Sequence, residues 1–240
     1  MRRIGSIIIL LLLLFQLLIV FVPPATQTSK AWWNSNWQYY KVCYINTNGY
    51  SGYYQMKLNV SYNGGGDVSC EGHCQADFDD IRFVDIDNTT VLPYWKETYV
   101  DSQYAIFWIN VSADAMSDGK ILMYYGNPSA TDESDGDDTF LFFDDFEGTS
   151  LDTSKWTTYG SDISISNGEL VIDSDGVWNL VFSNDNSFSD VVIETIAYNT
   201  KDAPDATCDF IGIGVAQSVG NTGVRGIADR SSAKKYGIYD

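Results

Sequence analysis

The sequence predicts an all-β protein, with two antiparallel β-sandwich domains of jelly-roll type after an N-terminal apolar helix. Apolar and polar residues alternate in many short runs, whereas helical periodicity is nearly absent. Of the 32 acidic residues, 26 are Asp, which favours turns, whereas Glu favours helices. We expect a signal peptide or membrane anchor at 1–31, a first sandwich at 32–138 and a second at 139–240.

The N-terminal segment has the parts of an export signal. Arg2 and Arg3 precede an apolar stretch from Ile7 to Val22. This stretch is long for the apolar part of a cleaved signal and slightly short for a membrane-spanning helix of about 20 residues. A pilin-like leader cut after Gly5 is a third interpretation, but the acidic residue expected soon after such a cut is lacking. All of these place the protein outside the cell or on its surface.

Strands are expected throughout the first domain. The pattern is clearest in residues 53–62, where Met56, Leu58 and Val60 share one face, as in a strand with one buried side. The run 104–111 is apolar on both faces, so we place it at the centre of a sheet. Further strands are expected at 37–46, 80–86 and 120–126.

The alternating pattern resumes after an acidic run, "TDESDGDD", at residues 131–138. We interpret this run as a solvated, turn-rich linker between the domains. Residues 162–173 predict a hairpin that turns at Asn167-Gly168, a pair that tolerates the positive φ angles of a tight turn. Further strands of the second domain are expected at 140–146, 176–182, 190–198 and 208–216.

Charge and residue types exclude several functions. A net charge of −18 without a basic stripe argues against nucleic acid as a partner. His73 is the only histidine, so Ser-His-Asp chemistry would have to use it. No strand carries the alternating acids of jelly-roll glucanases: Glu194 stands alone, and Asp144 and Asp145 would face opposite sides of a strand. We therefore expect that the protein is not an enzyme.

Several spaced motifs resemble, in the same order, the family catalogued as domain of unknown function 2341. They are "DIRFVDID", "LPYWKE", "FWINV", "YYGNPSA" and "TFLFFDDF", within about residues 32–146. In similar proteins this module is commonly followed by a concanavalin A-like or laminin-G-like jelly roll, and residues 140–240 resemble the opening part of one. The resemblance implies an incomplete second sandwich or a longer protein, and it names no ligand.

The cysteines suggest an oxidising compartment. Cys70 and Cys74 flank His73 in the segment "CEGHC", and an exported protein favours a Cys70–Cys74 disulfide there. A zinc site that combines these three residues with a nearby carboxylate is the alternative. We interpret Cys43 and Cys208 as small buried strand residues, while a bridge from Cys43 to the "CEGHC" loop stays open.

Two kinds of modification or ion site follow from short patterns. N-x-S/T triplets make Asn59, Asn88 and Asn110 candidate glycosylation sites. No cofactor is required, but Asp-rich turns supply the oxygen ligands that calcium prefers. A structural calcium ion is therefore expected, if anywhere, near Asp144 or Asp145.

Trp32 and Trp33 precede the first strand and are the freest aromatic residues for binding a ligand. We expect an exported cell-surface binding or adhesion module whose partner is an envelope glycan or a surface protein. It would contact the membrane only through an uncleaved N-terminal helix. Two alternatives stay open: a non-catalytic accessory region of a larger secreted glycan-active enzyme, and a structural envelope or filament component.

Overall fold

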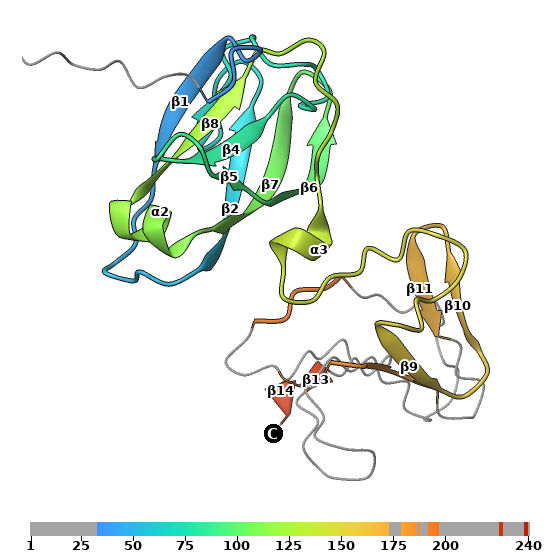
Figure 1. The fold of residues 1–240 in the computed structure, drawn as a ribbon. Coiled ribbons are helices and arrows are strands. Elements are labelled where there is room, and N and C mark those ends of the chain that lie inside the picture. The colour runs from blue at the N-terminus through green and yellow to red at the C-terminus, as the bar shows by residue number, and fades with distance from the viewer. Residues whose placement is uncertain are drawn as a thin grey trace, which may run out of the picture. The chain divides into compact units, whose positions relative to one another are not determined.

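The computed structural model of the 240-residue chain describes residues 33–172, 179–185, 187 and 192–196, and the backbone of 226–227 and 238–239. Most of its regular structure is β-strand in antiparallel sheets, with few helices (Figure 1). The predicted N-terminal helix, Trp32 and Cys208 lie outside the described residues, as does the strand expected at 208–216.

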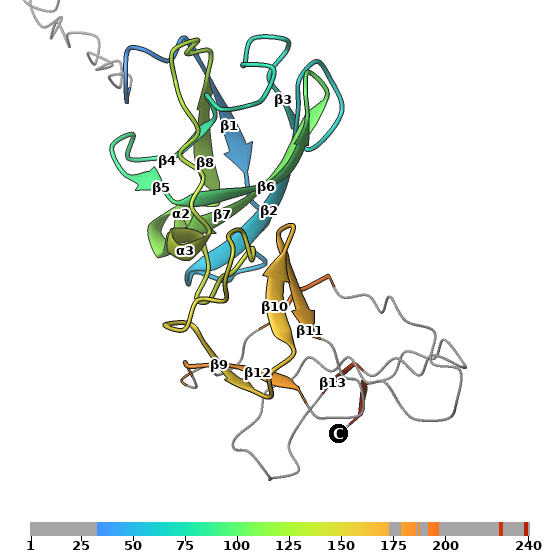
Figure 2. The ribbon, with the colours of Figure 1, turned by 90° about the vertical axis from the view of Figure 1, so that its right-hand side faces the viewer.

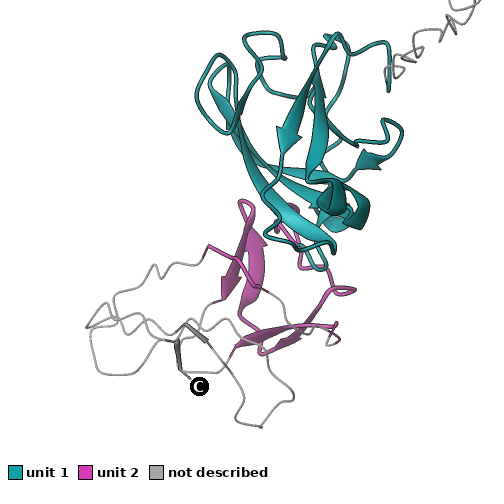
Figure 3. Ribbon diagram, turned by 90° about the vertical axis from the view of Figure 1, so that its left-hand side faces the viewer, with its two compact units in different colours: residues 1–143 teal, residues 144–240 magenta. Residues whose placement is uncertain are grey.

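Two compact units divide the chain, residues 1–143 and residues 144–240 (Figure 3). The division falls a few residues after the expected boundary at 138, because the short helix α3 (Gly136–Thr139) and the segment that follows it pack within the first unit. Each unit is described by itself.

The first unit contains two four-stranded sheets (Figures 1 and 2). In the first sheet the order is β1-β8-β4-β5, formed by Tyr39–Tyr44, Lys120–Tyr125, Arg82–Asp85 and Val91–Leu92. In the second sheet the order is β3-β2-β7-β6, formed by Val68–Ser69, Tyr54–Ser61, Tyr104–Val111 and Tyr94–Val100. Neighbouring strands are antiparallel except for the short parallel pair β2–β3.

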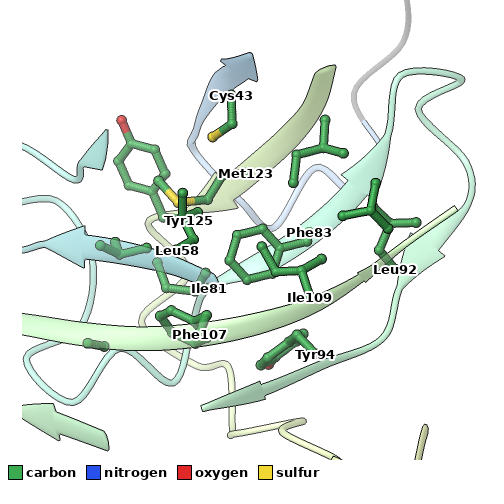
Figure 4. Packing of buried hydrophobic residues seen from close by; sticks show 14 of the residues in the cluster. Cys43, Leu58, Ile81, Phe83, Leu92, Tyr94, Phe107, Ile109, Met123 and Tyr125 are labelled. Carbon is green, nitrogen blue, oxygen red and sulfur yellow. The ribbon is translucent and has the colours of Figure 1, made fainter. Parts of the chain in front are cut away.

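Both sheets contribute side chains to one hydrophobic cluster (Figure 4). Phe83 of β4, Tyr94 of β6 and Phe107 of β7 meet edge to face, with ring centroids 5.4 to 5.7 Å apart. The alternation predicted for residues 53–62 is confirmed, since Leu58 and Val60 are buried in this cluster. Burial of such side chains is the main favourable term in folding.

A short helix, α2 (Ala113–Asp118), connects β7 to β8. The Ser112 hydroxyl accepts a hydrogen bond from the Ala115 N–H, which caps the first turn. Gly119 ends the helix with a φ of 66°, a left-handed conformation that glycine adopts without strain. Six residues are too few to show a helical period in the sequence.

The second unit contains the pairs β9 (Trp156–Tyr159) with β12 (Leu180–Ser183) and β10 (Ile163–Ser166) with β11 (Glu169–Ile172). The predicted hairpin is confirmed: Asn167 and Gly168 connect β10 and β11 with φ angles of 55° and 74°. Beyond these, the short strands β13 (Gly226–Ile227) and β14 (Ile238–Tyr239) pair with each other.

The strand expected at 140–146 is wrong, because this segment has irregular backbone. Phe140 and Phe143 stack with centroids 5.6 Å apart, and both contact the ring of Trp95. Residues three apart on a strand would face opposite sides. The two rings can therefore share one surface only where the chain leaves the extended conformation.

Candidate functional site

A shallow pocket of about 290 Å³ opens beside β1 and the loop between β3 and β4. Its wall is aromatic: the rings of Tyr39 and His73 stack 4.4 Å apart, and Tyr39 also stacks on Tyr125 at 5.5 Å. Burial, together with the nearby Cys70 and Glu71, raises the pKa of Tyr125 to about 12. The stacking contacts of Tyr39 with His73 and Tyr125 make His73 one member of a stack of three rings.

The floor of this pocket is tied together by Asp80. This buried carboxylate accepts backbone N–H bonds from Gln75 at 2.9 Å, Gly126 at 2.6 Å and Asn127 at 3.1 Å. Burial raises the pKa of the Asp80 carboxyl, and the three hydrogen bonds oppose that rise. Gly126 has a φ of 88°, and a Cβ there would overlap the Tyr39 ring. Asp80 thus shapes the pocket and has its oxygens occupied.

One cysteine, Cys74, lines the pocket, and three cysteines of the described residues are buried free thiols: Cys43, Cys70 and Cys74. Cys70 and Cys74 are in hydrogen-bonding contact, and this contact and burial raise the pKa of the Cys70 thiol. Burial raises the pKa of Cys43 to about 11. The disulfide between Cys70 and Cys74 is not formed in the structure, although the two side chains are neighbours.

Metal sites find little support in this geometry. Within the described part of the chain, no three His, Cys, Asp or Glu side chains are grouped so that they could hold an ion. Asp144 Oδ2 accepts a hydrogen bond from Trp156 Nε1 at 2.5 Å, and its Oδ1 accepts one from the Phe146 N–H at 2.8 Å. Asp145 is exposed and accepts from the Glu147 N–H. The predicted calcium site thus has its first carboxylate engaged in local structure.

The acidic run is a segment of the first unit, bound there through Arg82 and Lys96 while most of its residues stay exposed to solvent. The buried guanidinium of Arg82 binds both carboxylate oxygens of Glu133, each at 3.0 Å. It also donates to the backbone oxygen of Thr131 at 2.6 Å and to the hydroxyl of Tyr94 at 3.1 Å. A fork of this kind matches a carboxylate in two places at once.

A second cation, Lys96, binds Asp132 of the run. Lys96 Nζ lies 2.5 Å from Asp79 Oδ1 and 3.0 Å from Asp132 Oδ2. Burial favours the neutral form of Lys96, but these hydrogen bonds outweigh it and raise its pKa. The Asp135 N–H donates to the backbone oxygen of Tyr94 at 2.8 Å, alongside β6. The run therefore lies beside β6, the edge strand of the second sheet.

Aromatic residues fix the end of this segment. Phe140 and Phe143 pack on Trp95 of β6, and Phe140 also contacts Trp108 of β7, with centroids 4.7 to 5.8 Å apart. Buried Gly136 lies so close to the Phe143 ring that a Cβ would overlap it. We name residues 131–143 the acidic strap. It is held by Arg82 and Lys96 at one end and by these rings at the other.

Trp33, predicted to be free for a ligand, is partly buried. Its ring packs on Trp37 at 5.0 Å and on Tyr124 at 5.6 Å, against the face of the first sheet that points away from the main core. Trp37 is buried, and its Nε1 donates to the backbone oxygen of Asp80 at 2.6 Å. Trp33 therefore belongs to a small second cluster.

The exposed aromatic residues are instead tyrosines. Nine tyrosines are exposed in the described residues, and six of them lie between residues 39 and 54: Tyr39, Tyr40, Tyr44, Tyr50, Tyr53 and Tyr54. They belong to β1, the start of β2 and the connection between these strands. Sequence reasoning missed them because it weighed only tryptophans. The composition of residues 46–54, which are rich in Tyr, Asn, Gly and Ser, could have indicated an exposed loop there.

The three candidate glycosylation sites are largely enclosed. Asn88 is buried, and its Oδ1 accepts a hydrogen bond from the Tyr124 hydroxyl at 2.5 Å. The Oδ1 atoms of Asn59 and Asn110 are buried without a hydrogen-bond partner, and Asn110 Nδ2 donates to Asp138 O at 3.3 Å. A glycan on Asn88 would require this buried side chain to turn outward, whereas Asn59 and Asn110 are partly exposed.

Part of the chain resembles a known protein family. Residues 77–159 match the model of a family described as a domain of unknown function, DUF2341. The matched range includes Arg82, Lys96 and the whole acidic strap, so the elements that hold the strap lie within it. No curated protein and no solved structure gave a match. In the part of the chain that the structure describes, no helix is long and apolar enough to cross a membrane.

Proposed function

We propose that this chain is an exported cell-surface module that binds an envelope glycan and performs no catalysis of its own. The observation that carries this proposal is the gathering of six exposed tyrosines in residues 39–54. Large aromatic side chains at the surface cost favourable burial, so their concentration in one stretch of the chain supports a binding role for that stretch.

Tyrosine suits a sugar ligand for a chemical reason. Its ring offers an apolar face to the C–H groups of a pyranose, and its hydroxyl donates and accepts hydrogen bonds. Tyr39 and His73 form such a face in the wall of the pocket, with Tyr39 36% exposed. A surface protein is the other partner that such an aromatic surface fits, and the experiment below separates the two.

Other features of the chain support export to the cell surface. The leader, with Arg2, Arg3 and the apolar stretch that follows, favours export. The neighbouring thiols of Cys70 and Cys74 could join in an oxidising compartment. In this proposal the first unit is a β-sandwich that carries the ligand surface, and the second is a concanavalin A-like jelly roll.

A glycan array tests the proposal directly. The full-length protein, exported by its expression host and purified in detergent, would be applied to an array of plant, microbial and animal glycans. We expect reproducible binding to a related group of glycans, weakened in a Tyr39→Ala variant that removes one ring of the pocket wall, with a thermal melt to verify that the variant folds. Silence on the array, with capture by purified surface proteins, would replace glycan by protein as the ligand.

One observation favours a structural envelope component as the second candidate. Strand β1 is an edge strand of its sheet, and Tyr40, Val42 and Tyr44 are exposed along it. An exposed apolar edge can pair with another chain. Sedimentation of the full-length protein would decide, because a structural component would assemble with rising concentration whereas a binding module would stay of one size.

A further inference from the structure

Two buried thiols lie side by side in the loop that follows β3 and forms one wall of the pocket. Cys70 is fully buried, Cys74 is 7% exposed, and their side chains are in hydrogen-bonding contact. Cys74 also lines the pocket, which gives a small reagent a route to this residue. We name residues 70–75 the cysteine loop.

The backbone of the cysteine loop already has the closed shape that a bridge requires. The His73 N–H donates to Cys70 O at 3.0 Å, and Glu71 and Gly72 have φ angles of 54° and 77°. This turn brings Cys74 back to Cys70, and cysteines whose side chains pointed apart could not be joined without movement of the backbone. Oxidation would therefore join two sulfurs that are neighbours before the reaction.

Residues inside this turn connect the loop to strand β1. Glu71 Oε1 lies 2.5 Å from Lys41 Nζ, and the His73 ring stacks on Tyr39 at 4.4 Å. Both contacts lie at the surface, since Glu71 and His73 are exposed. An exposed ion pair and one ring contact stabilise a loop only weakly. The pocket wall thus depends on how firmly the turn itself is closed.

We propose that Cys70 and Cys74 form a redox-controlled disulfide that fixes His73 of the pocket wall against strand β1. In this reaction both S–H bonds break and one S–S bond forms between the two residues. A disulfide reagent of the glutathione type takes up the two electrons and two protons, and its own S–S bond is reduced to two thiols. The closed ring restricts the open forms of the loop, in which His73 leaves Tyr39.

This inference concerns the pocket wall and not the identity of the ligand, so it goes beyond the proposed function. An oxidising compartment would close the bridge, whereas reducing conditions would leave both thiols free. The pocket would then reach its final rigidity only after export.

Peptide mapping of the full-length protein tests whether the bridge forms. The folded protein would be incubated with oxidised or reduced glutathione, alkylated in denaturant and digested with trypsin. The tryptic peptide 58–82 contains Cys70 and Cys74 and no other cysteine, and the peptide 42–57 contains Cys43. We expect the 58–82 peptide from oxidised protein to be unalkylated and about 2 Da lighter than its dithiol form. Two alkylated thiols after oxidation, or a link between the two peptides, would overturn the proposal.

Hydrogen exchange of the full-length protein tests whether the bridge fixes the wall. The amide protons of Gly72, His73 and Gln75 are held in hydrogen bonds, so they exchange when the loop opens. We expect exchange in residues 71–75 to be about tenfold slower in the oxidised than in the reduced protein, because the ring restricts the open loop. Exchange in β7 should be unchanged. Equal exchange in the two redox states would overturn the proposal even if the bridge forms.

Two variants assign the effect to the correct thiols. Cys43→Ser should show the same difference between oxidised and reduced protein as the parent, whereas Cys70→Ser/Cys74→Ser should show none. A difference that persists in the double variant would overturn the proposal, and the comparison within the parent needs no variant to fold. Silence on the glycan array would overturn the proposed function and leave this inference in place, because neither measurement here uses a ligand.

Discussion

Two segments of the first unit, residues 33–37 and the acidic strap, cover the outer faces of its sheets. Different interactions hold the two segments. Residues 33–37 cover the first sheet through the rings of Trp33 and Trp37, which pack around Tyr124. The N-terminal part of the acidic strap binds Arg82 of the first sheet, and its C-terminal part packs on Trp95 and Trp108 of the second sheet. The first cover is held mainly by aromatic packing, with the Arg82 guanidinium 5.3 Å from the Trp37 ring, and the second by ion pairs and aromatic packing together.

This difference shows that a run of acidic residues can be ordered when the fold supplies buried cations. The side chains of Arg82 and Lys96 are 1% and 5% exposed. Without the strap each would be a buried charge that has lost a partner, which destabilises the fold. Arg82 also contacts the other cover, since its guanidinium lies 5.3 Å from the centre of the Trp37 ring. Loss of Lys96, whose charge partners are Asp79 and Asp132, should therefore loosen the strap and leave residues 33–37 in place.

The largest expected effect is that of Arg82→Met. The substitution removes the guanidinium that satisfies the backbone oxygens of Asp79, Ile81 and Thr131, and the Ile81 oxygen is then left buried without its partner. We expect the free energy of unfolding to fall by about 3 kcal/mol. Urea unfolding followed by circular dichroism measures it.

Glu133→Gln is the matched control for that variant. The Glu133 side chain is 63% exposed, so its ion pair is screened by water and should contribute less than about 1 kcal/mol. If the two substitutions cost the same, the charge pair and not the buried carbonyl network holds the strap.

The second effect tests the aromatic end of the strap. Gly136→Ala places a methyl group against the Phe143 ring, which should cost about 2 kcal/mol by overpacking. Phe143→Ala removes the contact with Trp95 and should cost about 2 kcal/mol. In the Phe143→Ala background the cost of Gly136→Ala should vanish, which a double-mutant cycle measures. Additive costs would show that Phe143 does not pack on Gly136 in solution.

A third, smaller effect depends on pH. Lys96→Met should cost about 1 to 2 kcal/mol at pH 8, because it leaves Asp79 and Asp132 without their cation. The pKa of Lys96 is raised in the folded state, so its contribution is fully present below the unfolded value of about 10.4 and is lost as pH rises through the folded value. Thermal melts of parent and variant from pH 8 to pH 11 should therefore converge. A constant gap would mean that Lys96 acts through packing alone.

The smallest effect is expected at the ring-held cover. Trp33→Ala removes a half-buried ring from Trp37 and Tyr124 and should cost about 1 kcal/mol, independent of pH. Hydrogen exchange of the full-length protein should show faster exchange near residues 33–37 and unchanged exchange in the strap. Loosening of both segments together would show that the two covers are coupled.

Much of the sheet structure was accessible to sequence reasoning. Residues 104–111 form β7 as predicted, at an interior position of the second sheet, because a run that is apolar on both faces must be covered on both. Strand β6 was missed, since "YWKETYV" places Lys96 and Glu97 in mid-strand, where a ladder bulge interrupts the alternation. Of the predicted ligand residues, Trp33 became part of a cluster, and the exposed tyrosines near it were not predicted.

By itself the sequence determined the β character of this protein, its hairpin at Asn167-Gly168 and its resemblance to a family, because alternation and turn residues act between near neighbours. Only the tertiary structure decided what the acidic run does. Arg82 and Glu133 are 51 residues apart, and Lys96 lies on a different strand from Arg82. Which carboxylates of such a run are bound depends on which cations the fold buries beside it, and that depends on how distant strands pair.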